Sequence, residues 1–176
     1  MKKLLFLITI LCLATASFAQ GKKSIVIERF SNETAYGKGF FYEPEYDILT
    51  QNAVKVLNDK LVRSGFASST DEALKNTADY IVYGTITKFE LKDSGTQKKF
   101  YNSRVHTVNV GIEIRVVGKS GKEVYSDKAE GVYEVETEEF MGYDTTEQQV
   151  NLDVLCNGAF TKVLDSVYND IVNAIE

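Results

Sequence analysis

The stretch Ala78-Asp79-Tyr80-Ile81-Val82-Tyr83-Gly84-Thr85-Ile86 decides the fold, because it is rich in β-branched and aromatic residues that favour a strand. Along such a strand, Tyr80 and Val82 point to one face, whereas Ile81 and Tyr83 point to the other. A strand that is apolar on both faces is typical of the middle of a sheet with helices packed over both sides. We therefore expect an α/β domain organised around this strand.

The remaining elements can be placed around the central strand, which continues half-exposed to Leu91. Gly84 indicates a close approach by a helix or a bulge. We expect, in chain order, a strand over 24–30, a helix from about Asp47 to Ser64 that Gly65 ends, a connector or short edge strand over 66–70, a helical turn over 70–76, a turn over 93–96, a strand over 105–117, a hairpin turn over 118–121, a returning strand over 122–136, and a long C-terminal helix opened by the capping-box pattern at 145–149. The predicted fold class is α/β, a mixed β-sheet with flanking helices.

Two apolar stripes at helical spacing support the two long helices. The first helix carries Leu49, Ala53, Val56, Leu57 and Leu61, and the C-terminal helix carries Leu152, Leu155, Ala159, Val163, Val167 and Ile171. We expect both stripes to lie against the sheet.

Residues 1–19 are typical of a secretory signal peptide. Lys2 and Lys3 supply the positive charge, residues 4–14 form an apolar run, and Ser17-Phe18-Ala19 supplies small residues at the cleavage positions. We expect cleavage before Gln20. The apolar run is too short to span a membrane as a helix, so no transmembrane segment is expected in the mature chain.

Cys12 raises the question of a lipid anchor, but Leu11 is not the small residue that a lipobox requires before its cysteine. The expected location is therefore periplasmic or secreted, without a lipobox. Residues 20–176 are expected to form a single domain. Without Lys2 and Lys3, the 20 basic residues fall to 18 against 25 acidic ones. That balance argues against a nucleic-acid partner and against charge-driven adhesion to an anionic membrane.

The order of these signatures resembles the CsgG-like family, which includes curli-secretion channel proteins and LpoB-type activators of penicillin-binding proteins. The resemblance is carried by Phe30 with Asn32, by Gly65, by Ala78-Asp79-Tyr80 with Val82 and Gly84, by Gly118-Lys119-Ser120-Gly121-Lys122-Glu123-Val124, and by the C-terminal helix. It implies a CsgG-like domain over residues 20–176 that acts in envelope assembly or secretion by contacting other proteins. The sequence departs from the channel proteins at 93–107 and 127–151, which carry charges and lack a continuous apolar face of spanning length.

Catalytic and metal-binding motifs are weak in this sequence. His106 is the only histidine and has no nucleophile motif beside it, and Cys156 lies on the apolar stripe of the last helix. Glu134, Glu136, Glu138 and Glu139 could attract a cation but lack the spacing of a calcium loop. We therefore expect no enzyme activity, no cofactor and no metal site.

The loop from Ser31 to Pro44 is the predicted partner-binding surface, because binding loops often follow the carboxyl end of a strand. Its candidate residues are Asn32, Thr34, Tyr36, Phe40, Phe41 and Tyr42, of which Tyr36 and Tyr42 are expected to be exposed. The predicted function is that of a non-enzymatic envelope protein that binds an envelope partner or itself. The alternatives are an LpoB-like activator of a penicillin-binding protein and an unrecognised hydrolase.

Overall fold

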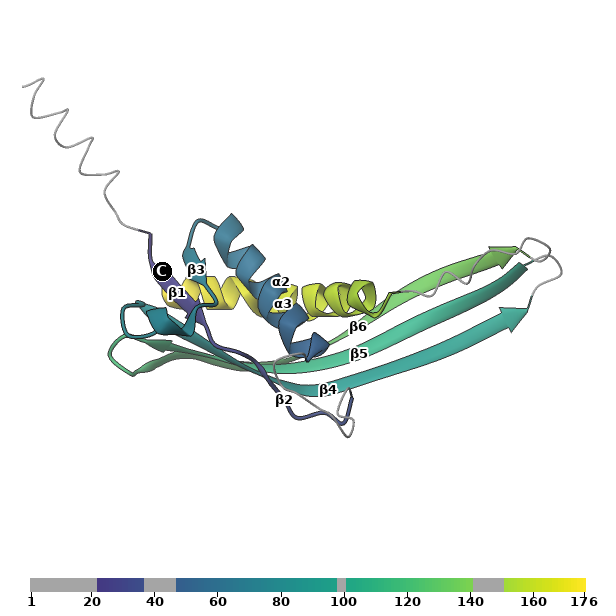
Figure 1. Ribbon diagram of the computed structural model, residues 1–176, viewed down its shortest axis with the longest axis horizontal. Coiled ribbons are helices and arrows are strands. Elements are labelled where there is room, and N and C mark those ends of the chain that lie inside the picture. The colour runs from purple at the N-terminus through teal and green to yellow at the C-terminus, as the bar shows by residue number, and fades with distance from the viewer. Residues whose placement is uncertain (1–21, 37–46, 98–100, 141–150) are drawn as a thin grey trace, which may run out of the picture.

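The computed structural model describes residues 22–36, 47–97, 101–140 and 151–176. They form one six-stranded mixed sheet with two helices, α2 (Ile48–Arg63) and the long C-terminal α3 (Leu152–Ile175), as Figure 1 shows. The other elements are β1 (Ser24–Ile27), β2 (Ser31–Asn32), β3 (Ala67–Ser69), the 3-10 turn η2 (Glu72–Leu74), β4 (Tyr80–Gln97), β5 (Tyr101–Gly118) and β6 (Glu123–Phe140). The predicted fold class is confirmed.

The central strand lies where the sequence predicts. The strand order is β3-β1-β4-β5-β6, and β2 pairs with β4 on the same side as β1. β4 runs parallel to β1 and β2 and antiparallel to β5. Gly84 is a point of close approach, but the neighbour is not the predicted helix: a Cβ at this position would overlap the ring of Phe30, which lies between β1 and β2.

The expectation that helices cover both faces of β4 is wrong. Both helices lie on one face, which we call the inner face, and the other is the outer face (Figure 1). Val82 and Ile86 point inward and are fully buried, whereas Ile81 and Tyr83 on the outer face are only half-buried. The guanidinium of Arg115 lies 4.9 Å from the centroid of the Tyr83 ring. A cation over an aromatic face shields part of the outer surface without a helix.

Both helices begin and end at residues with the expected chemistry. Asp47 caps α2, since its Oδ1 accepts hydrogen bonds from the amides of Leu49 (2.9 Å) and Thr50 (3.3 Å). Gly65 follows the helix with a φ of 92°, a conformation that favours glycine. Asn151 caps α3. The capping-box pattern at 145–149 lies outside the described residues.

The buried stripes of the helices are confirmed, and they join the inner face of the sheet in one core. All five predicted residues of α2 are buried, as are Leu155, Ala159, Val163, Val167 and Ile171 of α3, and Leu152 packs against them. β5 alternates as predicted, with Val108, Val110, Ile112, Ile114 and Val116 all buried on the inner face. This core fixes the position of both helices.

Three strands are longer than the sequence predicts, at 18 residues each. The turn expected over 93–96 is wrong, because β4 continues to Gln97 in unbroken register with β5, including Asp93 opposite His106 and Gly95 opposite Arg104. Cross-strand pairing satisfies the backbone here, so polar residues extend the ladder where no core requires it. The real hairpin turn at 118–121 is confirmed, with Gly121 at a φ of 78°.

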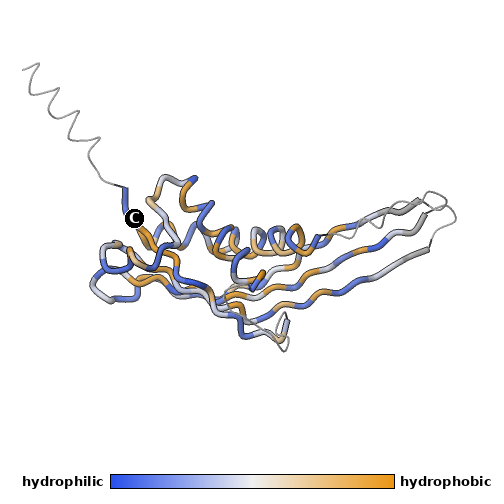
Figure 2. Tube along the Cα trace, in the orientation of Figure 1, coloured by the Kyte–Doolittle hydropathy of each residue, from blue (hydrophilic) through white to orange (hydrophobic). Residues whose placement is uncertain are grey.

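The extended strands project beyond the helices as a three-stranded arm, which we define as residues 92–97, 101–107 and 136–140 (Figure 1). Figure 2 shows hydrophilic and hydrophobic residues alternating along the long strands that lead into it. The core ends with the row of Leu91, Val108 and Tyr133, and with Val135 one inner-face row further along β6, just before the arm begins. The arm is therefore held by strand pairing rather than by a core of its own.

Candidate protein-binding surfaces

The sheet has two long free edges among the described residues. β6 is the last strand of the sheet and pairs only with β5 along its whole length. On the opposite side, β4 pairs with β1 over 80–82 and with β2 over 85–86. Its edge from Lys88 to Gln97 has no strand partner in the described part of the chain, although the ring of Tyr36 packs against Phe89 near its start. Unpaired N–H and C=O groups along an edge strand are a template for pairing with another chain.

Charged side chains cover the outer face between these edges. Lys128 contacts Glu113 at 2.9 Å, and Lys88 on β4 reaches across Gly111 of β5 to contact Glu130 on β6 at 3.3 Å. Hydrogen bonds to Glu113 raise the pKa of Lys128. Each of these pairs contributes little to stability because it is exposed.

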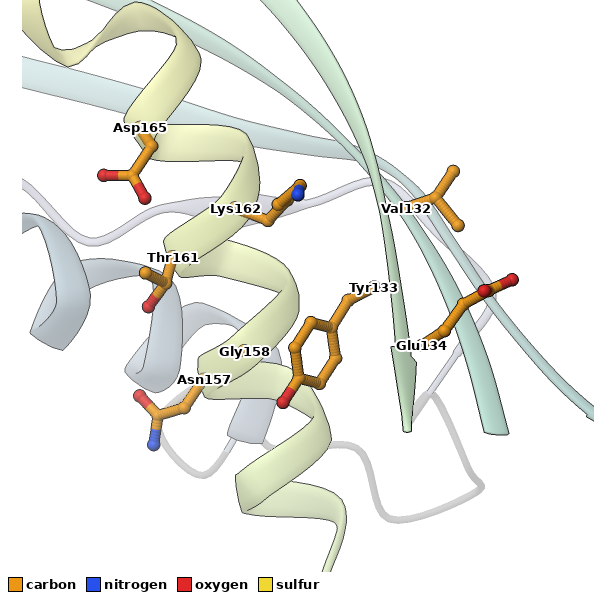
Figure 3. Close-up of a pocket in the computed structure, with 8 residues that line it drawn as sticks. All are labelled: Val132, Tyr133, Glu134, Asn157, Gly158, Thr161, Lys162 and Asp165. Atoms are coloured by element: carbon orange, nitrogen blue, oxygen red, sulfur yellow. The ribbon is translucent and has the colours of Figure 1, made fainter. Parts of the chain in front are cut away.

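A groove of about 730 Å³ runs beside the free edge of β6, between that strand and α3 (Figure 3). It is lined by Val132, Tyr133, Glu134, Asn157, Gly158, Thr161, Lys162 and Asp165. Val132 and Glu134 point away from α3, and the exposed fraction of Val132 is 51%. An exposed valine on an unpaired strand edge is a surface that another chain can cover.

Glycines set the depth of this groove by letting α3 lie close to β6. The ring of Tyr133 rests against Gly158, where a Cβ would overlap it (Figure 3). At Gly131, a Cβ would lie only 3.3 Å from the Cβ of Val163. Lys162, on the rim, has no ion-pair partner among the described residues, whereas Asp165 pairs with Lys60. The groove thus combines a close-packed floor with a polar rim.

Asn32 and Thr34, two of the predicted partner-binding residues, lie in an internal hydrogen-bond cluster. The buried Asn32 amide donates to Asp47 (2.8 Å) and to the carbonyl of Tyr36 (3.3 Å), and its Oδ1 accepts from Thr34 Oγ1 (2.7 Å). The sequence reasoning missed this role of Asn32. The cluster links the start of the loop to the N-cap of α2, so these two side chains are occupied within the chain.

The prediction that Tyr36 is exposed is wrong. Its ring is half-buried and packs against Phe89, with ring centroids 4.6 Å apart. Burial raises the pKa of its hydroxyl. Phe40, Phe41 and Tyr42 lie outside the described residues, so the partner-binding role of the loop stays a prediction.

The residues considered for chemistry are dispersed. His106 Nδ1 lies 2.7 Å from Asp93 Oδ1 across the β4–β5 ladder, with no nucleophile described beside them. Cys156 is fully buried in the core, and burial raises the pKa of its thiol to about 12. Glu136 accepts a hydrogen bond from Ser103, and Glu134 accepts one from Thr107 (3.4 Å). No group of three metal-ligating side chains occurs among the described residues.

Neither helix of the described chain has the length and apolar character needed to cross a membrane.

Comparison with known proteins gives matches to solved structures only. No protein-family model matches the chain, and no curated protein matches it. It is similar to a dodecamer of PelC from Paraburkholderia phytofirmans, with 14% identity over 81% of this chain and 86% of that one and a TM-score of 0.44. It is also similar to the lipoprotein GNA1162 from Neisseria meningitidis (16% identity, 86% and 99% covered, TM-score 0.41) and to a minor lipoprotein from Acinetobacter baumannii (11% identity, 87% and 91% covered, TM-score 0.41).

The resemblance to the CsgG-like family is corrected by these comparisons. The similar structures are PelC and lipoproteins, and no family model supports a CsgG-like assignment. The short signatures that carried the resemblance, such as Phe30 before Asn32 and Gly84 in the central strand, have local explanations in this fold: Phe30 fills the space that Gly84 leaves. At such low identities, the likeness to the solved structures concerns the fold and transfers no function.

Proposed function

We propose that this chain is a non-enzymatic protein of the cell envelope that acts by binding other protein chains through the free strand edges of its sheet. The observation that carries the proposal is the 18-residue strand β6, whose outer edge has no partner among the described residues and adjoins a groove of about 730 Å³. Binding by strand addition uses main-chain hydrogen bonds for affinity and alternate side chains for specificity.

The envelope location rests on the signal-peptide pattern of residues 1–19, which predicts export to the periplasm or beyond. Curli assembly and activation of a penicillin-binding protein were implied by the CsgG-like resemblance, and we propose neither now that it is overturned. A hydrolase is disfavoured by the placement of His106, which pairs with Asp93 on the arm rather than with a nucleophile.

The proposal can be tested with a photo-crosslinking amino acid placed at Val132 in the full chain and activated in intact cells. Val62 on α2 is the matched control, since its exposed fraction of 50% is nearly that of Val132 at 51%. We expect crosslinked protein adducts from position 132, recovered in the envelope fraction, and none from position 62. Absence of adducts at position 132, or recovery of the chain in the cytoplasm, would contradict the proposal.

A further inference from the structure

We infer that the partner at these edges is a second copy of this chain, with the β6 edge of one copy joined to the β4 edge of the next. This inference rests on the proposed function and names its partner. It is carried by the strand registers, which place complementary charges at matching heights on the two free edges.

The registers define three rows across the outer face. Lys88 is level with Gly111 and Glu130, Glu90 is level with Asn109 and Val132, and Lys92 is level with Thr107 and Glu134. Along its free edge, β4 therefore presents positive Lys88, negative Glu90 and positive Lys92. Along its own edge, β6 presents negative Glu130, neutral Val132 and negative Glu134. When two copies meet in level register, each lysine faces a glutamate and Glu90 faces the neutral Val132.

Pairing of identical edges is disfavoured by the same pattern. Two β6 edges that meet antiparallel about Val132 place Glu130 opposite Glu134, and two β4 edges that meet about Glu90 place Lys88 opposite Lys92. Like charges directly opposite each other on neighbouring strands are destabilising. Over the rows from Lys88 to Lys92 and from Glu130 to Glu134, charge therefore favours the junction between unlike edges.

The geometry of the sheet is compatible with repeated addition. β4 and β6 both run antiparallel to β5, so they run in the same direction, and copies in the same orientation meet in a parallel junction. On the inner face, the half-buried Leu91 is level with the half-buried Tyr133, so the junction brings two apolar side chains together. A junction of unlike edges leaves one free edge at each end, which produces a closed ring or a filament.

The test uses Lys92→Glu and Glu134→Lys in the full mature chain, measured by sedimentation velocity over a range of concentrations at low salt. Each single variant is expected to self-associate about tenfold more weakly than wild type, because an attraction across the strands becomes a repulsion. A mixture of the two variants is expected to recover association near wild type, since both kinds of junction in an alternating assembly are again complementary. The double variant should also recover it.

Four outcomes decide the inference. Recovery in the mixture supports the junction between unlike edges, as does weaker association at ~150 mM salt, where exposed charges are screened within about 8 Å. Unchanged self-association of Lys92→Glu overturns the inference, since β6 would then pair without β4. Wild-type protein that stays monomeric at every concentration also overturns the inference. The proposed function is decided separately, by whether position 132 forms crosslinks to other proteins. Circular dichroism of each variant checks that the strands remain folded.

Discussion

The helix-covered part of the sheet and the arm are built from the same three strands, yet different interactions hold them. In the covered part, inward-facing residues of β4 and β5 such as Val82 and Ile112 are fully buried under α2 and α3. In the arm, the same face carries Asp93 paired with His106. Burial stabilises the first region, and backbone pairing extends the second.

This difference shows that one sheet can contain both a buried core region and an exposed region with free strand edges. A β ladder with a covered face can continue into solvent, because the covered part fixes the register and each further row only adds to an existing ladder. The arm gains free edges and charged faces that a core region could not carry. The predictions below separate the two regions by stability, from the largest expected effect to the smallest.

The largest effect is expected from Phe160→Ala on α3. Phe160 is fully buried in the core, so its truncation should lower the free energy of unfolding by ~3–5 kcal/mol. Val154→Ala on the same helix is the control, since Val154 is 53% exposed and should change stability by less than ~0.5 kcal/mol. Urea unfolding followed by circular dichroism gives both values. Equal effects at the two positions would mean that α3 does not pack as described.

A second comparison uses two glycines of β4. Gly84→Ala places a Cβ against the ring of Phe30 and is expected to cost ~1–3 kcal/mol, whereas Gly95→Ala in the arm meets no heavy atom closer than 3.9 Å. The arm substitution should leave stability unchanged or raise it by up to ~1 kcal/mol, because alanine reduces the entropy of the unfolded chain. Thermal unfolding of both variants checks the contrast. A larger loss from Gly95→Ala would show that the arm is packed more tightly than its edges suggest.

Tyr36 tests the boundary between the core and the predicted binding loop. Tyr36→Ala removes the half-buried ring that packs on Phe89, and we expect a loss of ~1–2 kcal/mol in chemical unfolding. Tyr36→Phe is the matched control and should retain most of the stability, since it keeps the ring. If Tyr36→Ala is as stable as wild type, the Tyr36 side chain is again a candidate for partner binding.

The smallest effect is expected at Asp79, at the end of the sheet opposite the arm. Its carboxylate accepts hydrogen bonds from the amide and hydroxyl of Ser24, both at 2.8 Å, and these bonds lower its pKa. A lowered pKa in the folded state stabilises the fold above the unfolded pKa of about 3.9, and this contribution disappears as the pH falls through the folded value. Because the Asp79 carboxylate is partly exposed to solvent, which weakens this effect, Asp79→Asn should cost at most ~1 kcal/mol at neutral pH.

The measurement is the free energy of unfolding of wild type and Asp79→Asn between neutral pH and about pH 3, where the unfolded carboxyl is largely protonated. The two curves should converge as the pH falls. Parallel curves would show that the Ser24 hydrogen bonds do not depend on the charge of Asp79.

The sequence by itself determined the elements whose signals are local. Asp47 as the cap of α2, Gly65 after it, the two helical stripes, the hairpin turn with Gly121 and the alternation of β5 all follow from neighbouring residues, and the structure confirms them. The central position of β4 also followed, because its apolar stretch has few other places in a sheet. These features depend on backbone propensities and on periodicity within one segment.

Only the tertiary structure decided which face of the sheet the helices cover and how far the strands run. The sequence predicts that Ile81 and Tyr83 lie on a second buried face, but both are only half-buried. Arg115 covers part of the Tyr83 ring, and a local sequence pattern does not reveal this contact because Arg115 is distant in the chain. The sequence predicts a turn over residues 93–96, because the partner that extends the ladder there comes from β5, which is later in the chain. The sequence predicts Asn32 as a binding residue, because its hydrogen bond to Asp47, fifteen positions away, forms only in the tertiary structure. Pairing, covering and free edges depend on residues far apart in the chain, and local patterns carry no information about them.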